Sequence, residues 1–435
     1  MKNGVNNLGA VLTLYFTYFA YAMGLIVSGQ LAGSPDKGWG LSVAWGVETK
    51  DVISAISVMA IGKIIVYPFA GWLSDRFGRK NIVLTGIILN AAFFLLLPIS
   101  PNRTIGMLLA LVFGASNSFL DAGTYPTLME SNPKNAGTMN ILIKVFISAG
   151  QFLMPIFVGI VGGPNWRVIC FVVGGYQIVM AVLASFMRFP DYKAIAREQA
   201  ALTEAAAADE AQSAGASNAL KPRFAVEGVA CLVFIFCTNG VVYLANQALP
   251  QIGGGIAGLD ADQSKYLTSF FTIGSVTAVL LTALLSAKVK SINFVPWYAL
   301  GGVISVGLLN AGFMHSMAGM CLAAFLIGYF VSGGIMQLVL TAMAEFFPKV
   351  KGQITSWYWI AGSVGGFILP YAIGAIVPST KGMADAQAAE ALASGYTNVA
   401  WLALGFAVVA LLAALFVYRR YRVIFPKSME ELAAA

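Results

Sequence analysis

Apolar stretches about as long as a membrane is thick recur along the whole 435-residue chain. A helix needs roughly 20 apolar residues to cross the hydrocarbon of a bilayer. Only 10% of the residues are charged, against about 25% in soluble domains, so lipid is the solvent that suits this chain. We predict an all-α membrane protein with twelve transmembrane helices, at residues 8–31, 51–73, 81–100, 105–129, 138–162, 167–188, 225–249, 265–287, 292–314, 317–343, 353–377 and 396–418. The first run is too long for the apolar part of a signal peptide, so we expect no cleaved leader.

Lysine and arginine are distributed unevenly between the connecting loops. Eighteen of the 26 lie at the termini and in every second loop, six lie in the opposite loops, and Lys63 and Lys144 lie inside apolar runs. Because basic loops stay in the cytoplasm, this bias predicts that both termini are cytoplasmic in a multi-pass protein of the cell (inner) membrane. The net charge of +7 therefore reflects topology, and we expect no nucleic-acid partner.

The two halves of the chain share a repeated pattern. Residues 130–137 and 345–352 both read Glu-x-x-Pro-Lys-x-x-Gly, 215 positions apart, and four further identities follow at the same offset. Six helices separate the copies, so the halves are parallel repeats, an architecture typical of secondary transporters with a substrate site between the halves. We predict six-helix bundles at 1–189 and 225–420, a cytoplasmic linker at 190–224 and a cytoplasmic tail at 421–435. The linker is interpreted as either a tether or a regulatory segment.

A ten-residue loop motif follows the second apolar run. Residues 71–80 read Gly-Trp-Leu-Ser-Asp-Arg-Phe-Gly-Arg-Lys, which resembles the G-x-L-x-D-R-x-G-R-[KR] signature of the major facilitator superfamily. The resemblance implies a secondary transporter that works by alternating access. A glycine permits close helix approach in lipid, and Asp75 can meet a helix N-terminus, where the dipole favours an anion. We predict a cytoplasmic latch, with positive-inside topology alone as the alternative; its residues are Gly71, Asp75, Arg76, Gly78, Arg79, Glu130 and Glu345.

Three ionisable residues lie deep in apolar runs: Lys63, Asp121 and Lys144. A charge at the centre of a membrane helix costs roughly 2.5–3.5 kcal/mol, so such residues usually face a cavity or a partner. Asp121 is interpreted either as a proton carrier or as a fixed partner of one of the lysines. Two lysines against one aspartate would attract an anionic substrate, although either lysine could instead extend its ammonium towards the membrane surface.

The fourth run carries a narrower resemblance. Residues 120–126, Leu-Asp-Ala-Gly-Thr-Tyr-Pro, are similar to the L-E-x-x-x-N-P stretch of fucose:proton symporters. That glutamate takes part in proton coupling in the family, and Asp121 stands in its place here. The family also has an aspartate in its first helix, whereas the first run of this chain has no acidic residue.

Polar side chains recur on the runs that would line the cavity according to the superfamily resemblance. Amides and hydroxyls beside aromatic rings suit a sugar-like or other polar solute, and hydrogen bonding between helices is the alternative. Together with the two lysines, the predicted substrate-binding residues are Asn117, Tyr21, Asn239, Tyr243, Asn246, Gln337 and Trp359.

No phosphate-binding loop, metal-ligand cluster or catalytic motif is visible in the sequence. We therefore expect no enzyme activity, no cofactor and no metal. The expected partners are a small-molecule substrate, protons as the coupling ion and the lipid bilayer, and we expect a monomer. Three functions stay open: proton-coupled symport of an organic anion, a sugar acid or a neutral sugar; proton-driven export of amphipathic compounds; and a membrane sensor that transports nothing.

Overall fold

The computed structural model describes residues 7–32, 38–47, 49–161, 163–191, 194–195, 197, 222–259, 261–286, 289–378 and 385–425. Helices account for nearly all the regular structure within these ranges. The chain divides into two compact units, one of residues 1–206 with 348–360 and the other of residues 207–347 with 361–435. The predicted linker at 190–224 lies mostly outside the described residues, and the predicted domain boundaries stay a prediction.

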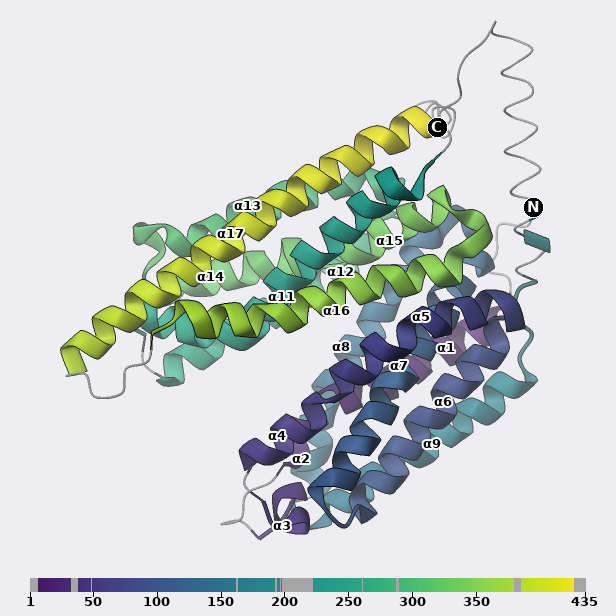
Figure 1. The fold of residues 1–435 in the computed structure, drawn as a ribbon, viewed down its shortest axis with the longest axis horizontal. Helices are drawn as coiled ribbons and strands as arrows, with labels where there is room; N and C mark the ends of the chain where they lie inside the picture. Colours follow the sequence, from purple (N-terminus) through teal and green to yellow (C-terminus); the bar gives the residue numbers. More distant parts are fainter. Residues whose placement is uncertain are drawn as a thin grey trace, which may run out of the picture. The chain divides into compact units, whose positions relative to one another are not determined.

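The first unit is built from the helices of the first half of the chain (Figure 1). They are α1 (Leu8–Leu25), α2 (Val27–Leu31), α3 (Leu41–Trp45), α4 (Thr49–Ser57), α5 (Met59–Phe77), α6 (Arg79–Leu96), α7 (Arg103–Ser131), α8 (Ala136–Val161) and α9 (Trp166–Phe186). Three side-chain hydrogen bonds join α5 to α7. Ser118 donates to the carbonyl oxygen of Lys63 at 3.0 Å, Ser74 donates to that of Ala122 at 2.8 Å, and Tyr67 donates to the carboxylate of Asp121 at 2.5 Å. These bonds fix the register of the two helices that carry the buried charges.

The second unit contains the helices of the second half. They are α11 (Val229–Ala257), α12 (Ala261–Ser286), α13 (Val295–Gly307), α14 (Met317–Ile327), α15 (Ile335–Phe346) and α17 (Asp385–Ile424). Helix α16 (Lys351–Ile376) belongs to both units, because its first ten residues group with the first unit.

Eleven segments of the described chain are helices long and apolar enough to cross a membrane. Each corresponds to one of the predicted spans, and α16 covers most of the remaining predicted span at 353–377. The all-helical membrane fold is confirmed, whereas the count of twelve and the orientation of the termini stay predictions. Many large apolar side chains are exposed on these helices, for example Phe69 at 62% and Trp297 at 72%, as expected for surfaces that contact lipid.

Several of the predicted spans are interrupted. The first is divided at Ile26 into α1 and α2. The second is divided at Val58 into α4 and α5. The tenth is divided by a π-helical turn (Gly328–Ser332) and two glycines, after which α15 begins. Gly334 has φ 103°, a backbone conformation that only glycine adopts at little cost. The break in this span therefore depends on a residue without a side chain.

We predict that Gly334→Ala lowers the free energy of unfolding by about 1–3 kcal/mol, because alanine is strained at this φ. Thermal unfolding of the purified protein in detergent measures the effect. Gly405→Ala is the matched control, since its added methyl group would meet no atom within 4 Å and alanine favours a helix. Equal midpoints for the two variants would contradict the assigned backbone conformation.

Candidate functional site

Asp121, near the middle of α7, is the centre of a buried polar cluster. Its side chain is 5% exposed. One carboxylate oxygen accepts a short hydrogen bond from the hydroxyl of Tyr18 on α1, and the other accepts one from Tyr67 on α5 at 2.5 Å. Asn117, one turn earlier on α7, places its amide beside this carboxyl group. Three helices thus supply the polar contacts that a buried carboxylate needs.

Lys63 belongs to the same cluster. It lies one turn before Tyr67 on α5, and its ammonium nitrogen lies 3.3 Å from the hydroxyl oxygen of Tyr21 on α1. Asp121 is its charged neighbour, but no described carboxylate lies within ion-pair distance of Lys63. The structure therefore brings the Lys63 ammonium and the Asp121 carboxylate into one cluster without the direct ion pair that is the alternative interpretation of the sequence.

Aromatic rings surround these two charges. The ring of Tyr18 lies 5.6 Å from that of Tyr21 and 6.3 Å from that of Tyr125, and Tyr125 lies 5.7 Å from Trp359 at the start of α16. All four residues belong to the first unit. The indole N–H of Trp359 is buried and has no hydrogen-bond partner among the described residues. Since an unpaired buried donor is costly, this N–H is available for a ligand.

Lys144, on α8, lies apart from the Asp121 cluster. Asn140, one turn earlier, is fully buried. Lys144 makes no ion pair or hydrogen bond within the described part of the chain, and Asp121 is not among the charges that act on it. The two predicted lysines therefore have different surroundings: Lys63 lies beside a carboxylate, and Lys144 does not.

Apart from Trp359, the predicted substrate-binding residues of the second half lie in the second unit. Asn239 on α11 donates to the carbonyl oxygen of Gly362 on α16 at 2.7 Å, which is a hydrogen bond between helices. Gln337 is 2% exposed, and the oxygen of its side-chain amide has no hydrogen-bond partner among the described residues. Tyr243 is partly buried. The side chain of Asn246 lies outside the described residues.

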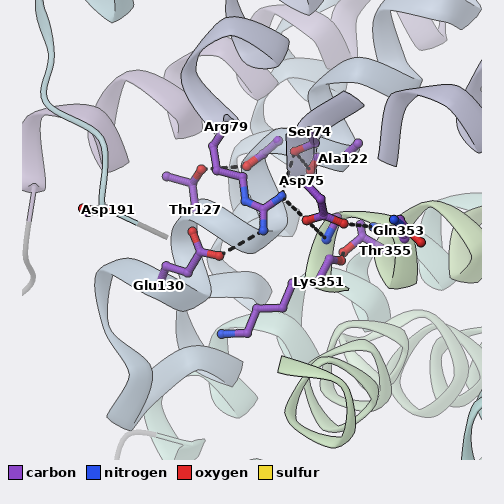
Figure 2. A network of polar contacts seen from close by, with 12 residues as sticks. Ser74, Asp75, Arg79, Ala122, Thr127, Glu130, Asp191, Lys351, Gln353 and Thr355 are labelled. Carbon is purple, nitrogen blue, oxygen red and sulfur yellow. Dashed lines mark hydrogen bonds and ion pairs between the residues drawn. The ribbon is translucent and has the colours of Figure 1, made fainter. Parts of the chain in front are cut away.

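A second polar network surrounds the loop motif at the end of α5 (Figure 2). The Asp75 carboxylate accepts hydrogen bonds from the backbone N–H groups of Gly352 at 3.1 Å and Gln353 at 2.9 Å. These groups lie at the N-terminus of α16, where the helix dipole favours an anion. Arg79 is 3% exposed and contacts Asp75 at 2.6 Å and Glu130 at 3.2 Å. One buried guanidinium thus joins α5, the start of α6 and the end of α7.

The two glycines of the motif have separate tasks in this geometry. A Cβ on Gly71 would lie 2.7 Å from the carbonyl oxygen of Gly352 and 2.8 Å from the Cα of Gln353, so α5 approaches α16 too closely for any side chain. Gly78 has φ 95° and forms the turn between α5 and α6, which places Asp75 and Arg79 side by side.

Two predicted latch residues lie elsewhere. The Arg76 guanidinium stacks on the rings of Trp72 and Phe77 at 5.0 and 5.6 Å. Glu345, in the second unit, accepts a short hydrogen bond from the hydroxyl of Tyr421. Sequence reasoning missed Tyr18 and Tyr67, and the only available signal for Tyr67 was its position one turn after an intramembrane lysine.

A helical membrane fold with buried charges and this loop-motif network is consistent with a secondary transporter. A model of the Major Facilitator Superfamily matches residues 7–370. The chain therefore belongs to this superfamily. It is a multi-pass transporter of the inner membrane and not an enzyme.

Curated relatives and solved structures agree with this assignment. The chain is 30% identical to the inner membrane transport protein YdiM of Escherichia coli over 94% of both chains. It is 24% identical to the gentisate transporter of Corynebacterium glutamicum, over 86% of this chain and 82% of that one. Its fold is similar to that of XylE, a proton:xylose symporter, with a TM-score of 0.67 at 15% identity over 95% of both chains. The fucose:proton symporter FucP gives a TM-score of 0.65 at 14% identity over 94% of this chain and 98% of that one.

We predict that Arg79→Gln destabilises the protein by about 3–5 kcal/mol, because it leaves two carboxylates without their cation in a buried site. Thermal unfolding and transport in proteoliposomes measure the loss. The double variant Arg79→Gln/Glu130→Gln should recover part of the stability, since one orphaned charge is removed. Additive losses in this double-mutant cycle would show that the two side chains do not interact.

Proposed function

We propose that the protein is a symporter that moves a small organic anion together with a proton by alternating access. The observation that carries this proposal is the arrangement of Asp121 and Lys63, which share one buried cluster without forming an ion pair. Each charge is held by tyrosine hydroxyls instead. A carboxylate held only by neutral groups can gain a proton without breaking a salt bridge.

The charge of the cluster explains why proton and anion would travel together. When Asp121 carries a proton, Lys63 leaves the cluster with one net positive charge, which attracts an anion strongly at low local dielectric. When Asp121 loses the proton, the cluster becomes neutral and its attraction for the anion falls. Proton and anion therefore favour each other's binding, and this coupling is reciprocal.

The rings around the cluster suit a ligand with its own planar ring. Tyr21 and Tyr125 place aromatic rings beside the charges, with one face of Tyr21 stacked on Phe113 at 5.3 Å, and the indole N–H of Trp359 offers a donor. The relative named as a gentisate transporter supports this choice, because gentisate is a carboxylate on an aromatic ring. The solved structures of similar fold are titled as proton symporters of fucose and xylose, which supports coupling to protons. Lys144 is a second candidate contact for the anion, and Asn117, Asn239, Tyr243, Asn246 and Gln337 are the remaining candidates.

The network around Asp75 would act as the latch of the transport cycle. The network holds the end of α5 against the start of α16, and this close contact requires a glycine at position 71. Because the carboxylate binds backbone N–H groups, this contact forms only when the end of α5 meets the helix N-terminus directly. The two six-helix bundles at 1–189 and 225–420 would be the bodies that this latch holds on one side of the membrane.

We expect Asp121→Asn to abolish proton movement but not substrate exchange. Proteoliposomes with a trapped pH dye would receive gentisate, aliphatic monocarboxylates, sugar acids and neutral sugars in turn. The pH change driven by the active anion should fall at least about tenfold in the variant, as expected when the proton-carrying group is removed, while counterflow of the labelled anion persists.

Asp51→Asn is the matched control for this experiment, because Asp51 is 30% exposed and pairs with Arg103 away from the cluster. Proton coupling that survives in Asp121→Asn would remove Asp121 from the mechanism. A response of the wild type to neutral sugars alone would overturn the anion proposal, and drug resistance without anion uptake would favour an exporter.

We expect Lys63→Gln to raise the apparent KM for the anion roughly tenfold or more, since a hydrogen bond to a charged group contributes about 1.5–3 kcal/mol. Initial rates of labelled uptake at several concentrations separate KM from kcat. Lys63→Arg, which keeps the charge, should recover much of the affinity. Lys134→Gln, at an exposed position, is the control, and an unchanged KM in Lys63→Gln would exclude Lys63 from the anion site.

A further inference from the structure

The three cations of the loop motif have three different environments. Arg79 is buried between Asp75 and Glu130. The ammonium of Lys80 donates to the carbonyl oxygens of Ser185 at 2.5 Å and Met187 at 3.1 Å, at the end of α9. Arg76 joins neither group and is exposed. Of the three motif cations, only Arg76 has no hydrogen bond or ion pair to another described residue in the latch or at a helix end.

Two aromatic rings hold the Arg76 guanidinium. It lies 5.0 Å from the ring centroid of Trp72 and 5.6 Å from that of Phe77, and these two rings meet edge to face at 6.4 Å. No described carboxylate pairs with Arg76. The rings orient the guanidinium through cation–π contact but leave its N–H groups without an acceptor, so its charge is available to an anion from outside the protein.

The face of α5 that leads to Arg76 is apolar and exposed. Ile65, Phe69 and Trp72 are 57%, 62% and 45% exposed, and their spacing of four and three residues places them on one side of the helix. Tyr67 and Ser74, which are buried, lie on the other side and bond to groups of α7. Because α5 belongs to a membrane-spanning segment, the exposed face meets acyl chains, and a tryptophan at its end suits the membrane–water interface.

We propose that Arg76, Trp72 and Phe77 bind the phosphate headgroup of an anionic phospholipid, with one acyl chain along Phe69 and Ile65. The occupant follows from charge and shape together. The guanidinium requires an anion, its planar N–H edge matches a phosphate, and the apolar face beside it continues into the bilayer. This inference does not rest on the proposed substrate or on proton coupling.

Native mass spectrometry of the purified full-length protein tests this site directly. The protein is released from mixed micelles that contain equal amounts of phosphatidylglycerol and phosphatidylcholine, and the ratio of the two retained lipids is measured. One arginine near the membrane surface contributes about 1 kcal/mol to anionic lipid binding, which is about a fivefold change in the ratio. Arg76→Gln should lower the preference for phosphatidylglycerol by about this factor.

Three variants make the result specific. Arg167→Gln is the matched control, because Arg167 also stacks on a tryptophan but that ring, Trp166, is only 4% exposed; its lipid ratio should equal that of the wild type. Arg76→Lys should give an intermediate ratio, since it keeps the charge but loses the planar edge. Trp72→Leu should also lower the ratio, because the guanidinium loses its ring support.

An unchanged lipid ratio in Arg76→Gln would overturn the proposal, as would an equal fall in Arg167→Gln. Thermal midpoints in lipid-free detergent show whether each variant is folded. If Arg76→Gln does not fold, Trp72→Leu still tests the site. Inorganic phosphate added to the micelles should leave the lipid ratio unchanged. If phosphate alone displaces phosphatidylglycerol, the site binds a free anion and the lipid assignment is wrong.

Discussion

The carboxylate of Asp121 lies in the part of the protein that lipid surrounds, and the arrangement of α1, α5 and α7 is what makes that position tolerable. A charge at such a depth is expensive even on the most generous scale. Two tyrosine hydroxyls and a neighbouring amide offset this cost without neutralising the charge. A salt bridge with Lys63 would stabilise the carboxylate more firmly, but it would also hold this side chain in its charged form. Hydroxyl partners serve both protonation states, because a tyrosine can donate to a carboxylate and accept from a carboxylic acid.

Much of this fold was predictable because the bilayer restricts what a sequence can do. Apolar runs of one membrane thickness must form helices, and charged residues inside them usually face a cavity or a polar partner. Asp121 and Lys63 were found in this way. The interruption at Val58 was not predicted, since no proline or glycine marks it. The interruption near Gly334 could be anticipated from the adjacent glycines.

The partners of the buried charges were harder to predict than the charges themselves. Tyr18 lies 103 positions from Asp121 along the chain, and a tyrosine within an apolar run looks the same whether it packs or donates a hydrogen bond. The motif cations pose a similar problem. Arg76 and Arg79 are both parts of one signature, yet they lie on different sides of the chain because Gly78 turns the backbone between them. A motif predicts which residue types occur together, whereas only the backbone path decides which of them meet.

The two polar clusters of the first unit are connected by the same pair of helices. Tyr67 and Asp75 are eight residues apart on α5, about 12 Å along the helix axis, and Asp121 and Glu130 are nine residues apart on α7. Each helix therefore carries one group of the Asp121 cluster and one group of the Asp75 network at nearly the same spacing. Ser118 bonds α7 to α5 on the side of the Asp121 cluster away from Asp75, and Ser74, next to Asp75, bonds α5 to the carbonyl oxygen of Ala122, so sliding one helix along the other would break these bonds. On the proposed mechanism, a change at Asp121 that repositions Tyr67 also acts on Asp75, whose bonds to α16 accompany the close approach of Gly71 to that helix. Both helices contain a proline between the two clusters, Pro68 in α5 and Pro126 in α7, so a movement at one cluster would reach the other either as a shift of the helix or as a bend at these prolines.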